Sequence, residues 1–218
     1  MLHTGLQNLD GFLSGGIPKG AITDVFGAYG TGKTQMLFQV SSNAVRKNYH
    51  VLYVDTSGSF RPERIIEFHR NDESAMDMLE KIDVLRVTNT AEQIKSLQII
   101  RESDFDLILI DNVTDLFSYE YNYPEQMFEK NMLFMKYMHG LASHAIDQKI
   151  SIMVTNTVRQ IDDTEIENMH TAIDLFTHIK ICLFRNGANL FGKASWLQHS
   201  LDFSYELNPD GLADVEAI

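Results

Sequence analysis

The sequence of 218 residues is poor in cysteine, tryptophan and proline, with one, one and four of them. The single cysteine, Cys182, excludes an internal disulfide and fits a reducing cytoplasm. Because it lies in the apolar run 179–184, we expect a buried residue rather than a reactive thiol. No apolar run approaches the roughly 20 residues that cross a bilayer, and residues 1–5 do not begin a signal peptide. These absences predict a cytoplasmic protein without a membrane segment.

Basic residues are also scarce relative to acidic ones. Eighteen lysines and arginines stand against thirty aspartates and glutamates, which gives a net charge of −12. A field of that sign repels phosphate backbones, so non-specific nucleic-acid binding is disfavoured unless a local basic patch overrides it. The chain has no internal repeat, low-complexity stretch or Pro/Gly/Ser linker. Residues 1–218 are therefore predicted to form a single domain with a well-buried core.

The ten methionines are scattered through stretches with helical periodicity. Methionine fills irregular gaps in a core, but it also occurs on adaptable binding surfaces. Of these two interpretations, we favour core filler.

Apolar runs alternate with amphipathic stretches along the chain. Strands are predicted at 21–26, 51–55, 82–87, 106–111, 150–155 and 179–184. The clearest helix runs from about Glu125 to Asp147, where apolar residues recur at spacings of three, four and seven. This alternation predicts an α/β fold, a mostly parallel twisted sheet with helices on both faces. Turn signals at 185–189 and 208–211 indicate hairpins, so the C-terminal edge is expected to be antiparallel.

The strongest motif lies between the first predicted strand and a helical pattern. It is a complete G-x-x-x-x-G-K-[ST] phosphate loop, Gly27-Ala28-Tyr29-Gly30-Thr31-Gly32-Lys33-Thr34. Glycines let backbone N–H groups face a phosphate, and the following helix adds free N–H groups and its positive dipole end. Lys33 can then reach the β- and γ-phosphates, and the Thr34 hydroxyl can ligate Mg²⁺. The motif predicts a nucleoside triphosphate site.

Polar residues follow three of the predicted strands, at Asp55, Asp111 and Asn156. In parallel sheets, ligands gather at the carboxyl ends of the strands. Four apolar residues followed by Asp111, in a chain with a phosphate loop, form the usual second nucleotide motif. Asp111 is predicted to hold Mg²⁺, through water. The alternative is an aspartate that merely caps the end of a strand.

The chain resembles the core ATPase domain of the RecA/RadA recombinase superfamily, particularly its archaeal RadA and RadB branch. The resemblance extends from Thr4 to about Asp214. Besides the phosphate loop, it is carried by Thr4-Gly5 with Leu9-Asp10 and Gly15–Gly20, by Tyr53–Thr56 followed by Phe60-Arg61-Pro62-Glu63-Arg64, and by Thr155-Asn156. It implies a RecA-like fold, ATP and Mg²⁺ as cofactors, and a position for Arg64 along the adenine ring.

Two departures from the resembled family concern ATP turnover. RadA-type proteins carry a glutamate two residues after the aspartate of the Asp-Thr pair, where this chain has Ser57. A hydroxyl of ordinary pKa is a poor general base near neutrality, and such a base contributes roughly 10²–10⁴ in rate. The family also has a glutamine after Thr-Asn as a γ-phosphate sensor, where this chain has Thr157. We expect slow or no hydrolysis, with Asp55, Asp115 and Glu63 as candidate substitute bases.

A third departure concerns the two loops that contact DNA in the resembled family. Where the family has an arginine in the first loop, this chain has Ser118. Residues 112–130 contain four acids against Lys130, and residues 156–174 contain five against Arg159. The acids are Asp115, Glu120, Glu125, Glu129, Asp162, Asp163, Glu165, Glu167 and Asp174. We therefore expect weak intrinsic DNA binding, or binding only beside a partner, and interpret the acids as a solvated rim rather than a docking surface.

The resemblance starts at the core, without the N-terminal helical domain and phenylalanine-bearing linker with which RadA forms filaments. We expect no RadA-type filament from this chain by itself. The leading hypothesis is an ATP-binding RadA/RadB-like paralogue, an accessory factor in DNA repair and homologous recombination that works with a RadA-type recombinase or another repair protein. The alternative is a KaiC-like signalling or motor-accessory ATPase in which ATP occupancy is the signal. Ser57, Thr157 and Ser118 count against an active strand-exchange enzyme.

Overall fold

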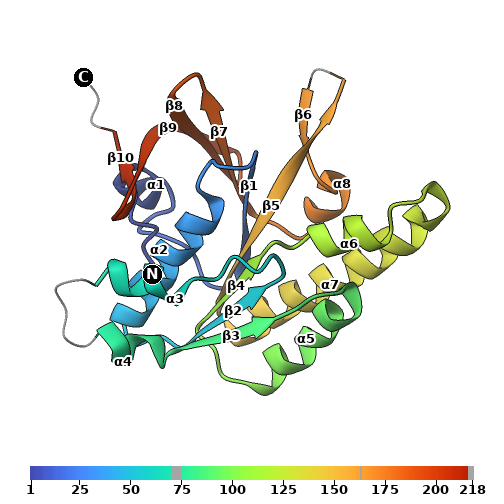
Figure 1. The fold of residues 1–218 in the computed structure, drawn as a ribbon, viewed down its shortest axis with the longest axis horizontal. Helices are drawn as coiled ribbons and strands as arrows, with labels where there is room; N and C mark the ends of the chain where they lie inside the picture. Colours follow the sequence, from blue (N-terminus) through green and yellow to red (C-terminus); the bar gives the residue numbers. More distant parts are fainter. Residues whose placement is uncertain (70–74, 163, 216–218) are drawn as a thin grey trace.

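Figure 1 shows the fold in a computed structural model, which describes residues 1–69, 75–162 and 164–215. The described strands form a sheet in the order β10-β9-β8-β7-β1-β5-β4-β2-β3, and β6 pairs with β5 alone. In chain order they are β1 (Ala21–Gly27), β2 (Val51–Asp55), β3 (Ile82–Arg86), β4 (Leu107–Asp111), β5 (Ser151–Ile161), β6 (Thr164–Glu167), β7 (Ile179–Asn186), β8 (Asn189–Trp196), β9 (His199–Asn208) and β10 (Gly211–Asp214). Strands β1 to β5 and β7 pair with one another in parallel, and the remaining pairings are antiparallel. The predicted α/β class with an antiparallel C-terminal edge is confirmed.

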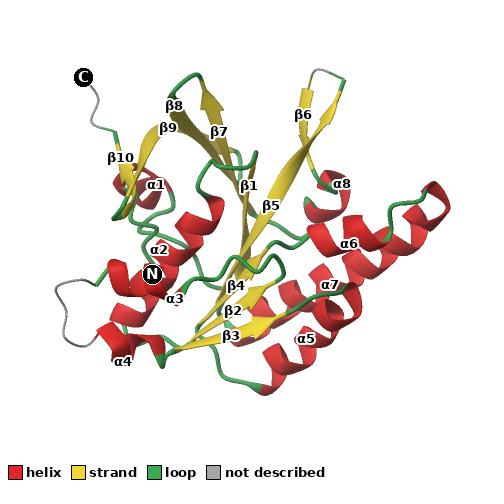
Figure 2. Cartoon of the chain, in the orientation of Figure 1, coloured by secondary structure: helices red, strands yellow, loops and turns green. Residues whose placement is uncertain are grey.

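Helices cover both faces of the sheet (Figure 2). One face carries α1 (Gln7–Phe12), α2 (Lys33–Arg46), α3 (Pro62–Glu67) and α4 (Ala75–Leu79), and the other carries α5 (Thr90–Glu102), α6 (Asp115–Glu120) and α7 (Met127–Gln148). A short 3-10 helix (Pro124–Gln126) precedes α7, and α8 (His170–Ile173) follows β6. Successive strand residues point to opposite faces, so Leu107 and Leu109 of β4 join one core and Ile108 and Ile110 the other.

The predicted hairpin turns lie where the sequence places them. Only residues 187 and 188 separate β7 from β8, and only residues 209 and 210 separate β9 from β10. The long helix also matches closely, since α7 ends at Gln148, one residue beyond the predicted end.

The largest difference from the predicted strands is in β5, which continues to Ile161 instead of ending at Thr155. The extension is the first arm of a hairpin with β6, in which Val158 pairs with Glu167 and Gln160 with Glu165. Beyond Thr155 the residues are mostly polar and lack the apolar run that marks the buried part of the strand. This arm and β6 stand out from the sheet in Figure 1, above the ends of the parallel strands.

The methionines are not all core filler. Met36 and Met138 are buried, whereas Met127, Met132 and Met135 of α7 are 44%, 52% and 38% exposed. The interpretation of methionine as filler is therefore wrong for one face of α7.

Cys182 is half-buried in β7. Burial raises the pKa of its thiol to about 11, so the thiolate is a minor species near neutrality. The residue is therefore less buried than predicted, while the raised pKa is typical of an unreactive thiol. Within the described residues, no helix combines the length and hydropathy of a bilayer-spanning segment.

Candidate nucleotide-binding site

The phosphate loop joins β1 to α2, and its backbone requires glycine at two positions. Gly27 has a φ of +149°, and a Cβ atom there would lie 1.9 Å from the carbonyl oxygen of Leu183 on β7. Gly32 is the N-cap of α2 in the left-handed region, with a φ of +93°. The first N–H groups of a helix have no acceptor within it, so the loop delivers free donors and a positive dipole end to one place.

Lys33 folds over the loop. Its ammonium group donates hydrogen bonds to the carbonyls of Gly27 and Ala28, both at 2.8 Å, and lies 5.6 Å from the centre of the exposed Tyr29 ring. Burial lowers the pKa of Lys33, while the nearby carboxylates of Asp111 and Asp115 oppose that shift. The cation is held at the mouth of the loop by weak neutral acceptors, which an incoming phosphate can replace.

The loop itself is braced from two sides. The Thr31 hydroxyl donates to the carbonyl of Ala28 at 2.8 Å, and the Tyr205 hydroxyl donates to the carbonyl of Thr31 at 2.5 Å. Tyr205 comes from β9, so the antiparallel edge of the sheet supports the phosphate loop.

A cavity of about 610 Å³ adjoins the loop. Its polar lining includes Lys33, Thr34, Ser57, Asp111, Asp115 and Thr157. These side chains come from the loop and from the carboxyl ends of parallel strands β2, β4 and β5, which meet at one edge of the sheet. Of the three polar strand-end residues singled out in the sequence, Asp111 lines this cavity, whereas Asp55 and Asn156 do not.

Asp111 lies beside Thr34 in this cavity and is only 4% exposed. Its Oδ2 accepts hydrogen bonds from the hydroxyls of Thr34 at 2.8 Å, Ser59 at 2.9 Å and Tyr53 at 3.0 Å. Its Oδ1 accepts one from Thr155. The carboxylate is therefore positioned by hydroxyls, and it does not merely cap the end of β4.

These groups fit the needs of a magnesium ion. Mg²⁺ prefers hard oxygen ligands and is commonly held by one or two side chains together with substrate phosphates and waters. The Thr34 hydroxyl and the Asp111 carboxylate supply such oxygens beside the phosphate loop. Within the described residues, no group of three or more His, Cys, Asp or Glu side chains could hold a metal ion by itself. A cation here would take its remaining ligands from the nucleotide and from water.

Ser57 offers no basic group to the cavity. Its hydroxyl donates to Ser59 Oγ at 2.7 Å and approaches Asp55 Oδ1 at 3.4 Å. Asp55 in turn accepts backbone N–H bonds from residues 57 to 60 and pairs with Arg86 at 3.2 Å. Asp55 therefore orders the turn after β2, and these contacts leave it poorly placed to act as a base.

Asp115 is the acid that does line the cavity. Burial is the main cause that raises its pKa, and the negative charge of Asp111 adds to it. The Thr157 hydroxyl donates to Asp115 Oδ1 at 3.2 Å. Of the three candidate substitute bases, Glu63 does not line the nucleotide cavity, and Asp55 is engaged by backbone N–H groups. Asp115 is therefore the remaining candidate.

Arg64 lies at the border of the cavity. Its guanidinium donates to Gln35 Oε1 at 3.3 Å and to the carbonyl of Pro209 at 3.2 Å, and it pairs with Glu67. Gln35 lines the cavity, whereas Arg64 does not, and Arg61 of the same segment does. The position of Arg64 along an adenine ring stays a prediction.

Sequence reasoning missed a largely buried hydrogen-bond network that links the segment after β4 to β5 and to the residues at the end of β6. Thr114 donates to Asn156 Oδ1 at 2.6 Å, and the Asn156 amide donates to Glu167 at 2.8 Å. The Asn168 amide donates to Thr114 at 3.0 Å and to Ser118 at 2.8 Å. The sequence singles out Asn156 as the polar residue after an apolar strand, and Ser118 and Glu167 as loop residues, but nothing in it indicates that they share one network.

Lys180 changes the charge balance of the second loop. Its ammonium group pairs with Glu167, with Asp174 at 2.5 Å and with the buried Asp24 at 3.1 Å. Burial lowers the pKa of Lys180, but Asp24 and Glu167 outweigh it and raise that pKa. Because Lys180 lies on β7, outside the two loops, the sequence count of nine acids against two bases did not include it. Asp163, one of those acids, lies outside the described residues.

Comparison with known proteins gives a consistent result. A family model described as Rad51 matches residues 1–174. The DNA repair and recombination protein RadA of Cenarchaeum symbiosum is 32% identical over 175 residues, which cover 75% of this chain and 44% of the relative. RadA of Metallosphaera sedula is 33% identical over 173 residues, covering 72% and 52%. The DNA repair protein RAD51 of Saccharomyces cerevisiae is 32% identical over 173 residues, covering 74% and 43%.

This chain spans about half the length of the curated relatives it matches. The family match covers most of the chain and includes the phosphate loop and Asp111. The chain belongs to the Rad51 family, within the RecA/RadA recombinase superfamily.

Proposed function

We propose that the protein is an ATP-binding RadA/RadB-like recombinase paralogue, a single RecA-like core domain that serves as an accessory factor in DNA repair and homologous recombination. The observation that carries the proposal is the phosphate loop with Thr34 and Asp111 side by side at its end. In this proposal, residues 27–34 bind the phosphates of ATP and Arg64 contacts its adenine. Thr34 binds Mg²⁺ directly, and Asp111 binds it through water.

Hydrolysis is slow or absent in this proposal. Ser57 stands where relatives of the RadA type have a glutamate, and its hydroxyl is bonded to Ser59. Thr157 stands at the sensor position and bonds to Asp115. Asp115 is the remaining acid near the phosphates, and it supports slow turnover at most. Occupancy by ATP, rather than its turnover, is then the functional state.

The partner is a RadA-type recombinase or another repair protein, because the relatives of this chain are named as recombination and repair proteins. The test is capture of partners from native lysate on the immobilised chain, with and without ATP, followed by mass spectrometry. We expect a RadA-type recombinase in the captured fraction, enriched when ATP is present. Capture of a motility or signalling complex instead would contradict the proposed function.

Intrinsic DNA binding should be weak. Acidic side chains dominate both loops, and Lys180 neutralises only part of the second one. A labelled single-stranded oligonucleotide, titrated by fluorescence anisotropy at low and moderate salt, should bind with micromolar affinity at best. ATP should not change this result. Nanomolar affinity that weakens steeply with salt would show an undetected basic surface and favour a strand-exchange enzyme.

A further inference from the structure

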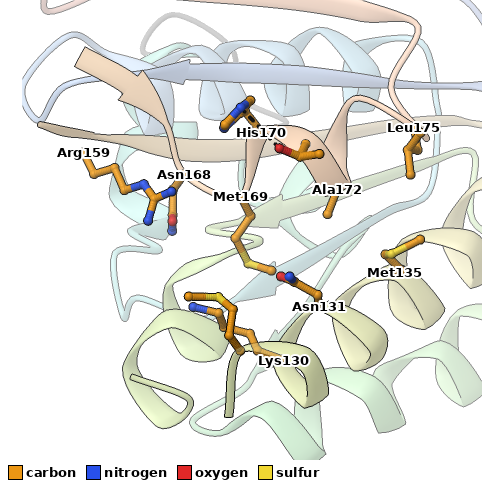
Figure 3. A pocket seen from close by; sticks show the side chains of 11 residues that line it. Lys130, Asn131, Met135, Arg159, Asn168, Met169, His170, Ala172 and Leu175 are labelled. Atoms are coloured by element: carbon orange, nitrogen blue, oxygen red, sulfur yellow. Dashed lines mark hydrogen bonds between the residues drawn. The ribbon is translucent and has the colours of Figure 1, made fainter. Parts of the chain in front are cut away.

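A second cavity, of about 230 Å³, lies between the N-terminal half of α7 and the segment that contains α8 (Figure 3). Met169 reaches from that segment toward Asn131 of α7, and Arg159 of β5 lies at one side. None of its lining residues lines the nucleotide cavity. It therefore forms a separate surface feature of the protein.

Two cations of this cavity have no acidic partner within the part of the chain that the structure describes. Lys130 is only 8% exposed, and among the residues that the structure describes no hydrogen bond or ion pair reaches its ammonium group. The guanidinium of the exposed Arg159 likewise has none within the described chain. Burial and the charge of Arg159 lower the pKa of Lys130, so the two cations act on each other. Most of the Lys130 side chain is covered, but Lys130 lines the cavity, where an anion from outside can reach it and serve as its partner.

Apolar side chains surround these cations and continue along the helix. Met127, Met135 and Leu175 line the cavity and are 44%, 38% and 65% exposed. Phe128 and Met132, next to them on α7, are 80% and 52% exposed. Exposed apolar groups gathered in one place mark interaction sites, and methionine adapts its shape to different partners.

The neighbouring charges favour a single carboxylate over a chain of phosphates. Glu129 directly precedes Lys130, and Asp162 and Glu165 lie on the same β5–β6 hairpin as Arg159. A nucleic acid would carry successive phosphates past these acids, whereas a peptide brings one carboxylate together with apolar side chains. Arginine also binds carboxylates in a two-pronged geometry. The mixture of cations and apolar groups therefore matches an acidic, apolar peptide.

We propose that this cavity binds a short segment of a partner protein in which one acidic side chain is flanked by apolar side chains. The carboxylate pairs with Lys130 and Arg159, and the apolar side chains contact the methionines of α7 and Leu175. The inference deepens the proposed accessory function and rests on it for the existence of a protein partner.

The test is a selection of random dodecapeptides, displayed on phage, against the immobilised full chain. We expect enriched peptides to carry Asp or Glu beside aliphatic or aromatic residues. The best peptide, labelled and titrated by anisotropy, should bind Lys130→Met at least about tenfold more weakly, because one member of a desolvated charge pair is removed. Lys136→Met, an exposed position on the same helix outside the cavity, is the matched control and should bind as the parent does.

Arg159→Gln provides a second variant, because an exposed side chain without partners can be replaced with little effect on folding. Its affinity for the peptide should fall as well. Enriched peptides without acids, or equal binding by the Lys130 and Arg159 variants, would overturn the inference. If these variants lose residual binding to single-stranded DNA while peptide binding is unchanged, Lys130 and Arg159 bind nucleic acid instead. That result would also overturn the inference. If acidic peptides are selected but neither a recombinase nor another repair protein is captured from lysate, the cavity assignment holds and the proposed function fails.

Discussion

Lys33→Ala should lose the thermal stabilisation that MgATP confers on the parent protein. The ammonium group at the mouth of the loop is the point charge for the β- and γ-phosphates, and alanine leaves only backbone donors. At a ligand concentration of about 100 times Kd, binding stabilises a protein by about 2.7 kcal/mol. For a chain of this size that corresponds to a rise in Tm of roughly 5–10 °C. Differential scanning fluorimetry with increasing MgATP measures the loss.

A matched control comes from the other end of the same helix. Lys47 is exposed at the C-terminus of α2, where its ammonium group donates to the carbonyl of Met1. Lys47→Ala should keep the full response to MgATP, whatever its own Tm. If Lys33→Ala responds to MgATP as strongly as the parent, the phosphate loop is not the nucleotide site.

Ser57→Glu should raise the rate of ATP hydrolysis by roughly 10²–10⁴, the contribution of a positioned general base. Ser57 lines the nucleotide cavity together with Lys33 and Asp111, so a glutamate there lies at the edge of the phosphate site. The measurement is phosphate release under saturating MgATP, and Ser57→Ala, which adds no base, should turn over ATP as slowly as the parent.

Two results would change this view of catalysis. A parent turnover equal to that of an active recombinase would show that Ser57 does not limit the rate, and Asp115 would become the base to test. No gain from Ser57→Glu would place the defect at Thr157, whose hydroxyl engages Asp115.

Local sequence signals predicted the parts of this protein that depend on short segments. The phosphate loop requires glycine at Gly27 and Gly32 for reasons of backbone geometry, so its motif is readable in the sequence. The buried strand β2 was predicted with its observed bounds, because four apolar residues followed by an aspartate mark both ends of the strand clearly. The position of Asp111 followed from the same reasoning, since the strand before it is fully buried.

Features that depend on distant segments were not predictable in the same way. The arm of β5 has no periodic apolar pattern, because its stability comes from pairing with β6 rather than from burial. Lys180 reaches the second loop from a strand that follows it, so a count over sequence windows could not include it. The cavity beside Lys130 arises only when α7 packs near α8, two helices separated by 21 residues of chain.

Asn168 lies between the two cavities: it lines one of them and contacts a residue that lines the other. It lines the cavity beside Lys130, and its backbone N–H donates to the carbonyl of Thr157 at 2.9 Å. Thr157 lines the nucleotide cavity on the other side. A ligand that displaced Asn168 would also move the Thr157 wall of the nucleotide cavity, and any change that it made in the affinity for a nucleotide would be matched by an equal change in its own affinity when the nucleotide binds.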